Sequence, residues 1–218
     1  MTNFRHRFRI AYYNLFSEVY DPFINLHSGD HNAALRDELA AALALEPDDA
    51  VLDLCTGTGS MLPALARQVG ETGSVVGVDF SPGMLNKARE KVRGQTNIDL
   101  READVAALPF PNDTFAGACI SHAFYELKGD TPLHFLHEVY RVLKPGGRFV
   151  MMEHEVPERP FIRLLFYSRI LSMGSAKTLK ILRHEQDIFR TVFPTVEKTL
   201  ASSGHSKLYL CTKAPAGT

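Results

Sequence analysis

The chain has 218 residues, of which 45% are hydrophobic and 22% are charged, and these values are typical of an ordered globular protein. Its 24 Lys and Arg residues are balanced by 25 Asp and Glu residues, and the net charge of −1 argues against a dedicated nucleic-acid-binding protein. No apolar run is long enough to span a membrane, and the N-terminus lacks the apolar region of a secretory signal. We therefore expect a single domain, residues 1–218, in the cytoplasm.

The three cysteines, Cys55, Cys119 and Cys211, lie far apart in apolar runs and form no C-x-x-C motif. This pattern predicts buried free thiols in a reducing compartment, because a disulfide framework or a structural zinc site needs paired cysteines.

The first 45 residues are rich in aromatic side chains and contain one expected helix, at residues 32–43. The aromatic residues of this region are Tyr12, Tyr13, Phe16, Tyr20 and Phe23. We expect a helical lid, which either covers the binding edge of the fold or packs on it as an amphipathic element.

Short apolar strands then alternate with helices. The expected strands are residues 51–55, 74–79, 98–101, 115–121 and 148–153, and the expected helices are residues 60–69, 82–92 and 130–143. Such alternation predicts βαβ units, which form a mostly parallel sheet with helices on both faces. The loops that begin at Cys55, Asp79, Arg101 and Ser121 should lie on one rim, because such sheets bind ligands at the carboxyl ends of their strands.

Two C-terminal regions differ from this alternation. Residues 157–184 hold six Lys or Arg residues and one Glu among apolar side chains. This pattern is typical of a surface helix with solvated arginines, and it also suits an amphipathic segment at an anionic membrane. Residues 195–201 and 207–212 resemble a β-hairpin around Ser203-Gly204, although VEKTLASSG, residues 196–204, could also be helical.

The stretch VLDLCTGTGS, residues 51–60, places a Gly-x-Gly between a strand and a helix. Here the backbone can approach a ligand closely, and the helix N-terminus can meet negative charge. The dinucleotide fingerprint requires a third glycine, and Leu62 occupies that position. The loop therefore does not match a pyrophosphate-binding site.

Two acidic residues extend this pattern along the rim. Asp79 ends the second strand, 20 residues after Gly59, where a carboxylate can accept both hydroxyls of a ribose. Asp104 follows the third strand, where it could accept a hydrogen bond from an adenine amino group. The alternative is that both acids cap helices or turns. Together with Asp53 they outline a site for an adenosine-type ligand that has no pyrophosphate.

Four segments in this order closely resemble the class I S-adenosylmethionine-dependent methyltransferases, and in particular the ubiquinone/menaquinone-biosynthesis C-methyltransferase group. These segments are VLDLCTGTGS, VVGVDFSPGML, EADVAALPFPNDTF and HEVYRVLKPGGRFVMMEH. The resemblance implies a Rossmann-like α/β fold with a seven-stranded, mostly parallel sheet and an antiparallel C-terminal hairpin. It also implies a cofactor-binding core at residues 48–155, a helical insertion on the acceptor side at 156–192 and the hairpin at 193–213.

The resemblance also implies roles for individual residues. The methionine end of S-adenosylmethionine would lie against Asp53, Cys55, Thr56, Gly57 and Gly59. The ribose would be bound by Asp79, the adenine faces by Phe80 and Met84, and the adenine edge by Asp104 and Val105. Ser121 would line the site beside the sulfonium.

Methyl transfer from a sulfonium is an in-line displacement, so positioning can supply much of the rate. A weakly acidic acceptor would also need a base. The catalytic candidates are His122, Tyr125, Glu126, Glu153 and His154. A hydrogen-bonded structural histidine is the alternative for His122, and a polar strand end is the alternative for the Glu153-His154 pair.

The expected function is therefore methyl transfer to a small hydrophobic or amphiphilic acceptor, such as a quinone precursor or a lipid headgroup. The alternatives are an NAD(P)-dependent oxidoreductase and a cofactor-binding module without turnover. No bound metal is expected, since His27 and His31 in HSGDH suit a helix start better than a metal site. Peripheral membrane contact through residues 157–184 and a homodimer are both compatible with the sequence.

Overall fold

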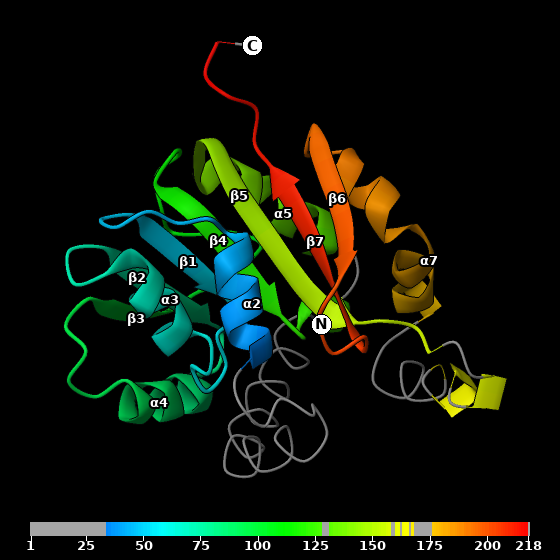
Figure 1. Ribbon diagram of the computed structural model, residues 1–218, viewed down its shortest axis with the longest axis horizontal. Coiled ribbons are helices and arrows are strands. Elements are labelled where there is room, and N and C mark those ends of the chain that lie inside the picture. Colours follow the sequence, from blue (N-terminus) through cyan, green and yellow to red (C-terminus); the bar gives the residue numbers. More distant parts are fainter. Residues whose placement is uncertain are drawn as a thin grey trace, which may run out of the picture. The chain divides into compact units, whose positions relative to one another are not determined.

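The computed structural model describes residues 34–127, 131–157, 160, 161, 163–165, 167 and 176–217. The chain divides into two compact units, residues 1–105 and residues 106–218 (Figure 1). The first unit contains α2 (Ala34–Ala42), β1 (Ala50–Leu54), α3 (Leu62–Val69), β2 (Ser74–Asp79), α4 (Pro82–Lys91) and β3 (Ile98–Glu102). The second contains β4 (Phe115–Ser121), the short 3-10 helix η1 (Phe124–Glu126), α5 (Thr131–Val142), β5 (Leu143–His154), α7 (Ala176–Arg190), β6 (Thr195–Leu200) and β7 (Ser206–Thr212).

The described residues contain seven strands in the order β3-β2-β1-β4-β5-β7-β6. The β1-β2, β2-β3 and β4-β5 pairs are parallel, and the β5-β7 and β6-β7 pairs are antiparallel. The expected mixed sheet with an antiparallel C-terminal hairpin is therefore confirmed. The helical alternative for VEKTLASSG is wrong, because β6 (Thr195–Leu200) pairs with β7.

In the first unit, the register aligns the carboxyl ends of three parallel strands. Leu54 lies opposite Val78, and Asp79 lies opposite Glu102. The backbone N–H of Ala103 then donates to the carbonyl of Asp79, 3.1 Å away. The loops after β1, β2 and β3 consequently start at the same edge, as the alternation of strands and helices predicted.

The helix after the glycine loop starts later than the sequence suggested. We expected it to begin at residue 60, and α3 begins at Leu62. Cys55, Gly57 and Gly59 all have positive φ, and residues 60 and 61 form a bend between these turns and the helix. The predicted start of α4 is confirmed, since the Ser81 hydroxyl accepts a hydrogen bond from the Met84 backbone N–H at 3.3 Å.

In the second unit, β5 is longer than the expected strand at residues 148–153. Its bounds include the Lys144-Pro145-Gly146-Gly147 turn, because Leu143 already pairs with Phe115. The register then shifts, and Arg148 pairs with Gly117, so the turn residues form an irregularity within the strand. The core of this unit contains six fully buried phenylalanines: Phe115, Phe124, Phe135, Phe149, Phe189 and Phe193.

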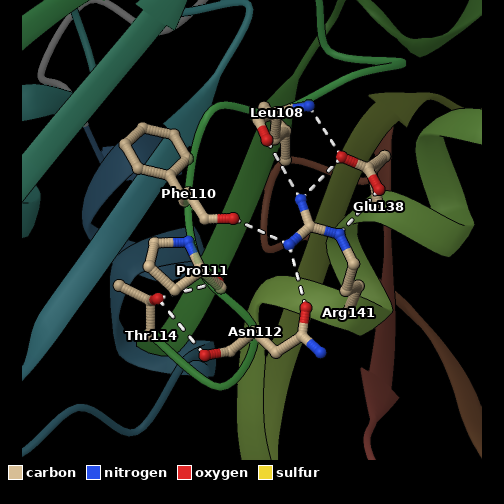
Figure 2. A network of polar contacts seen from close by, with 7 residues as sticks. All are labelled: Leu108, Phe110, Pro111, Asn112, Thr114, Glu138 and Arg141. Carbon is tan, nitrogen blue, oxygen red and sulfur yellow. Dashed lines mark hydrogen bonds and ion pairs between the residues drawn. The ribbon is translucent and has the colours of Figure 1, made fainter.

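A network around Arg141 explains why two of the sequence motifs occur together (Figure 2). The Arg141 guanidinium on α5 donates to the carbonyl oxygens of Leu108 and Phe110, at 3.0 and 2.7 Å. It also forms two hydrogen bonds of 2.8 Å to the Glu138 carboxylate, which accepts from the Leu108 backbone N–H. One charged side chain thus attaches the loop before β4 to α5. Hydrogen bonding to Arg141 also lowers the pKa of Glu138.

Candidate functional site

The loop after β1 has an unusual backbone conformation. Cys55, Gly57 and Gly59 have φ values of 54°, 55° and 76°, a region that favours glycine. At Gly59, a Cβ atom would lie 2.9 Å from side-chain atoms of Leu62 and Ala88, so glycine is needed for packing. At Gly57, only the Cys55 carbonyl oxygen would lie within 4 Å, at 3.9 Å. The backbone at Gly57 is therefore open to close approach by a ligand.

Asp79 connects this loop to the end of β2. Its side chain is 6% exposed, and its two carboxylate oxygens accept from the backbone N–H groups of Gly57 and Ser81, at 3.0 and 2.9 Å. The acid therefore has the turn-stabilising role that was the alternative to ribose binding. The two roles are compatible, because each carboxylate oxygen can accept more than one hydrogen bond.

The other expected cofactor residues of this unit differ in exposure. Asp53 is buried and accepts a hydrogen bond from the Thr56 hydroxyl. Cys55 and Phe80 are partly exposed, and Asp104 is exposed. Met84 and Val105 are buried, with exposed fractions of 3% and 6%. The assignment of these residues to parts of the cofactor stays a prediction.

The second unit brings three of the catalytic candidates together. Ser121 ends β4, and the backbone N–H of His122 donates to the Met152 carbonyl of β5 at 2.9 Å. His122 has a φ of 53°, and its Nδ1 lies 3.9 Å from Oε2 of Glu153. Its ring is 4.4 Å from the His154 ring, centroid to centroid. His122, Glu153 and His154 therefore form one cluster.

Glu153 is the buried member of this cluster, with an exposed fraction of 3%. Burial raises the pKa of its carboxyl to about 8, and the charge of Glu126 adds to this effect. The backbone N–H of Tyr125 donates to Glu153 at 3.5 Å, which opposes the rise. Glu153 can therefore exchange a proton near neutral pH, as a general acid or base requires.

Tyr125 has a different environment from the one the sequence suggested. Its phenol is buried and donates to Oε2 of Glu185 at 2.5 Å. Burial, together with the charges of Glu153 and Glu185, raises the pKa of this phenol far above its usual value. As a proton donor held by a carboxylate, Tyr125 is unsuited to act as a base.

Three polar residues of this region were missed by the sequence analysis: Glu185, Lys207 and Tyr209. Glu185 also forms an ion pair with Lys207 and accepts from the Tyr209 hydroxyl at 3.3 Å. Lys207 is 1% exposed and Glu185 is 5% exposed. A lysine at the start of the apolar strand KLYLC was the available signal, since lysines are seldom fully buried without a partner.

Several other expectations fall outside the described residues or concern exposed ones. His27, His31 and the N-terminal tyrosines lie outside the part of the chain that the structure describes. In the basic segment, residues 157–184, Phe161, Leu164 and Leu165 are 71%, 66% and 53% exposed. Among the described residues, no helix has the length and apolar character needed to cross a membrane. Of the expected free thiols, Cys119 and Cys211 are buried and Cys55 is partly exposed.

Sequence comparison identifies a matching protein family and related proteins. Residues 51–147 match the family model described as a methyltransferase domain. A demethylmenaquinone methyltransferase of Lactobacillus johnsonii is 36% identical over 158 residues, which cover 70% of this chain and 64% of the relative. That of Shouchella clausii is 31% identical over 194 residues, which cover 87% of this chain and 79% of the relative. The chain thus spans slightly less than two thirds of some of the relatives it matches.

Solved structures with low sequence identity share the fold. A chain from the Haloferax volcanii complex that contains the Trm112 methyltransferase activator has a TM-score of 0.73 at 22% identity, with 93% of this chain and 97% of that chain covered. A SAM-dependent methyltransferase from Aquifex aeolicus has a TM-score of 0.60 at 23% identity, with coverages of 83% and 93%.

The fold, with its glycine loop and acidic strand end, is Rossmann-like, and the matched domain places the chain among methyltransferases. Within this class, the chain belongs to the class I S-adenosylmethionine-dependent methyltransferase family and is related to the demethylmenaquinone methyltransferases.

Proposed function

We propose that this protein transfers a methyl group from S-adenosylmethionine to a small hydrophobic acceptor of the quinone type. The observation that carries the proposal is the hydrogen bond from the Gly57 backbone to Asp79, because it joins the open glycine loop to the acid that follows the neighbouring strand. Membership of the methyltransferase family supports the reaction, and the named activity of the relatives supports the acceptor class.

The residues of the first unit suit this cofactor. The backbone at Gly57 is open to a ligand, and Asp79 presents a carboxylate that can accept from ribose hydroxyls. Cys55, Thr56 and Gly59 would hold the methionine end of the cofactor, and Asp53 would hold Thr56 through the hydrogen bond from its hydroxyl. When bound, S-adenosylmethionine supplies a methyl group on a positively charged sulfur. The leaving group is the neutral thioether, which needs no protonation.

The second unit would serve the acceptor. An aromatic or enolic acceptor loses one proton for each methyl group that it gains, so the protein must provide a place for that proton. The His122 side chain is 20% exposed and Glu153 is 3% exposed, so an acceptor would reach His122 first. We assign the proton to this pair, with His154 packed against His122. Tyr125 then supports the pair and does not accept the proton.

The basic segment would bring the protein to its acceptor. Phe161, Leu164 and Leu165 are exposed next to Arg163, a combination that suits the surface of an anionic bilayer, in which prenylated quinones dissolve. Binding to anionic but not to zwitterionic vesicles, with loss of binding in Leu164→Glu, is the expected result. A homodimer is a further option, which sedimentation of the same preparation would decide.

The first experiment is calorimetric titration of the purified protein with S-adenosylmethionine, S-adenosylhomocysteine and NADH. We expect micromolar binding of the first two and none of NADH. Methyl-labelled cofactor with a reduced prenylated naphthoquinone should then give a labelled quinone. Binding of NADH alone would identify an oxidoreductase, and cofactor binding without transfer to this acceptor or to any component of a cell extract would indicate a module without turnover.

A further inference from the structure

A circuit of polar contacts connects Glu153 of the His122-Glu153 pair to Lys207, within the second unit. It runs from the Glu153 carboxylate to the Tyr125 backbone N–H, and from the Tyr125 phenol to Glu185. Glu185 then pairs with Lys207, which lies opposite Glu153 in the register of β5 and β7. The contacts join η1, α7, β7 and β5, and Figure 1 shows α7 next to the β6-β7 hairpin.

The register brings the charge of Lys207 close to Glu153. Residues directly opposite each other in an antiparallel pair project to the same side of the sheet, with Cβ atoms about 4.5–5.5 Å apart. Lys207 is held there because its ammonium group pairs with Glu185 and lies 5.5 Å from the centre of the Tyr125 ring. All of these side chains are buried, so water screens their charges weakly.

Among the described residues, titratable groups next to Glu153 come from several elements. His122 follows β4, Tyr125 and Glu126 belong to η1, and Lys207 belongs to β7. Glu185 of α7 reaches Glu153 through Tyr125 and Lys207. Glu126 raises the pKa of Glu153, and Lys207 lowers it. Since Lys207 is the cation in this circuit, its neutralisation by Glu185 limits how far it stabilises an ionised Glu153.

We propose that Glu185 and Lys207 are positioning residues that set the protonation state of the Glu153 carboxyl, and thereby the pH at which the His122-Glu153 pair accepts a proton. The catalytic part of this proposal rests on the proposed function. The alternative is a purely structural ion pair that attaches α7 to β7. In a positioning role, removing the positive charge of Lys207 and removing the negative charge of Glu185 shift the titration of Glu153 in opposite directions. A purely structural ion pair does not have this effect.

The test is an infrared titration of the buried carboxyl group, with the Glu153→Gln protein as the spectral reference. This readout needs neither cofactor nor methyl acceptor. In Lys207→Met the midpoint should rise by about one pH unit, because a nearby positive charge is lost. In Glu185→Gln it should fall by about half a pH unit, because Lys207 is no longer neutralised and Glu185 lies farther from Glu153. Midpoints within about 0.3 unit of the wild-type value in both proteins, or shifts of the opposite sign, would overturn the proposal.

Either single variant can unfold, because it leaves one buried charge without its partner. The double variant Glu185→Gln/Lys207→Met removes both charges and keeps similar volumes, so it should fold. Its midpoint should rise by about half a unit, since Lys207 is the nearer of the two charges to Glu153. An unchanged midpoint in a folded double variant would indicate a structural ion pair.

The pH profile of methyl transfer separates this proposal from the proposed function. If the labelled quinone forms, the lower limb of kcat against pH should move with the infrared midpoint, while the KM for S-adenosylmethionine stays constant. If the infrared midpoints shift as expected and no methyl transfer occurs, the proposed function fails and the electrostatic circuit is still supported. If transfer occurs and its pH profile is the same in all variants, the positioning role is wrong.

Discussion

The two units solve the problem of holding a buried carboxylate in different ways. In the first unit, Asp79 accepts hydrogen bonds from backbone N–H groups of Gly57 and Ser81, which lie 22 and 2 residues away. In the second unit, Glu185 is held by side chains of Tyr125, Lys207 and Tyr209. Backbone donors depend on the conformation of a loop, which a local sequence motif such as the glycine loop can encode. Side-chain donors depend on residue identity in distant segments, so a local motif does not indicate them.

A second contrast, within the second unit, appears in the pKa values of Glu153 and Glu138. The carboxyl of Glu153 accepts from the backbone N–H groups of Tyr125, at 3.5 Å, and His154, but its burial raises the pKa to about 8. Glu138 is less buried, accepts two hydrogen bonds from Arg141, and has a lowered pKa. Hydrogen bonding by a cation thus favours the ionised form, and burial without such a partner favours the protonated form.

The largest expected effect concerns the buried lysine. Lys207→Met should lower the free energy of unfolding by about 3–5 kcal/mol, because Glu185 would keep a buried charge without its cation. The matched control is Lys198→Met on the neighbouring strand. Lys198 pairs with Glu155 at 2.6 Å and is 35% exposed, so its loss should cost less than about 1 kcal/mol. Urea denaturation of both proteins measures the difference, and equal losses would contradict the role of burial.

The next effect is the dependence of stability on pH. The folded pKa of Glu153 lies above the value of about 4.3 expected in the unfolded chain, so the folded state binds the proton more tightly. Its contribution to stability is complete below pH 4.3 and is lost as the pH rises to about 8. Between pH 6 and 9, the wild-type protein should lose about 3 kcal/mol relative to Glu153→Gln. Parallel curves for the two proteins would mean that the pKa of Glu153 is not raised.

A smaller loss of folding stability is expected when the guanidinium of Arg141, drawn in Figure 2, is removed. Arg141→Met should destabilise the protein by about 2 kcal/mol, because the carbonyls of Leu108 and Phe110 and the Glu138 carboxylate lose a charged donor. Arg89→Met is a suitable control, since exposed Arg89 donates to Asn86 within the same helix. Its loss should stay within about 0.5 kcal/mol. Thermal unfolding of the two variants tests this ranking.

The smallest effect is on cofactor affinity. Asp79→Ala should weaken S-adenosylmethionine binding at least tenfold, or about 1.4 kcal/mol, because it removes a charged hydrogen-bond acceptor. Asp104→Ala, at the exposed acid after β3, should have a weaker effect. Calorimetry on folded protein measures both. An Asp79→Ala protein with wild-type affinity would leave that residue with only its turn-stabilising role.

Most of the first unit was predictable, because its information is local. Strand and helix periodicity located β1, β2 and α4, and the Ser81-Pro82 pair marked a helix start that the structure confirms. The predicted start of α3 was wrong by two residues, since hydrophobic spacing does not reveal the bend at residues 60 and 61. The cofactor roles of this loop stay predictions, although its geometry suits them.

The family, the mixed α/β fold and the glycine loop with Asp79 could all be predicted from the sequence, because short-range patterns encode strands, turns and loop glycines. The tertiary structure was needed to show that Tyr125 is a buried hydrogen-bond donor and that Lys207 lies opposite Glu153. The reason is physical: charge and burial at one residue depend on side chains that are 22 to 60 positions away along the chain. Strand pairing and helix packing bring those side chains together, and the hydrophobic periodicity of the sequence does not predict such long-range contacts.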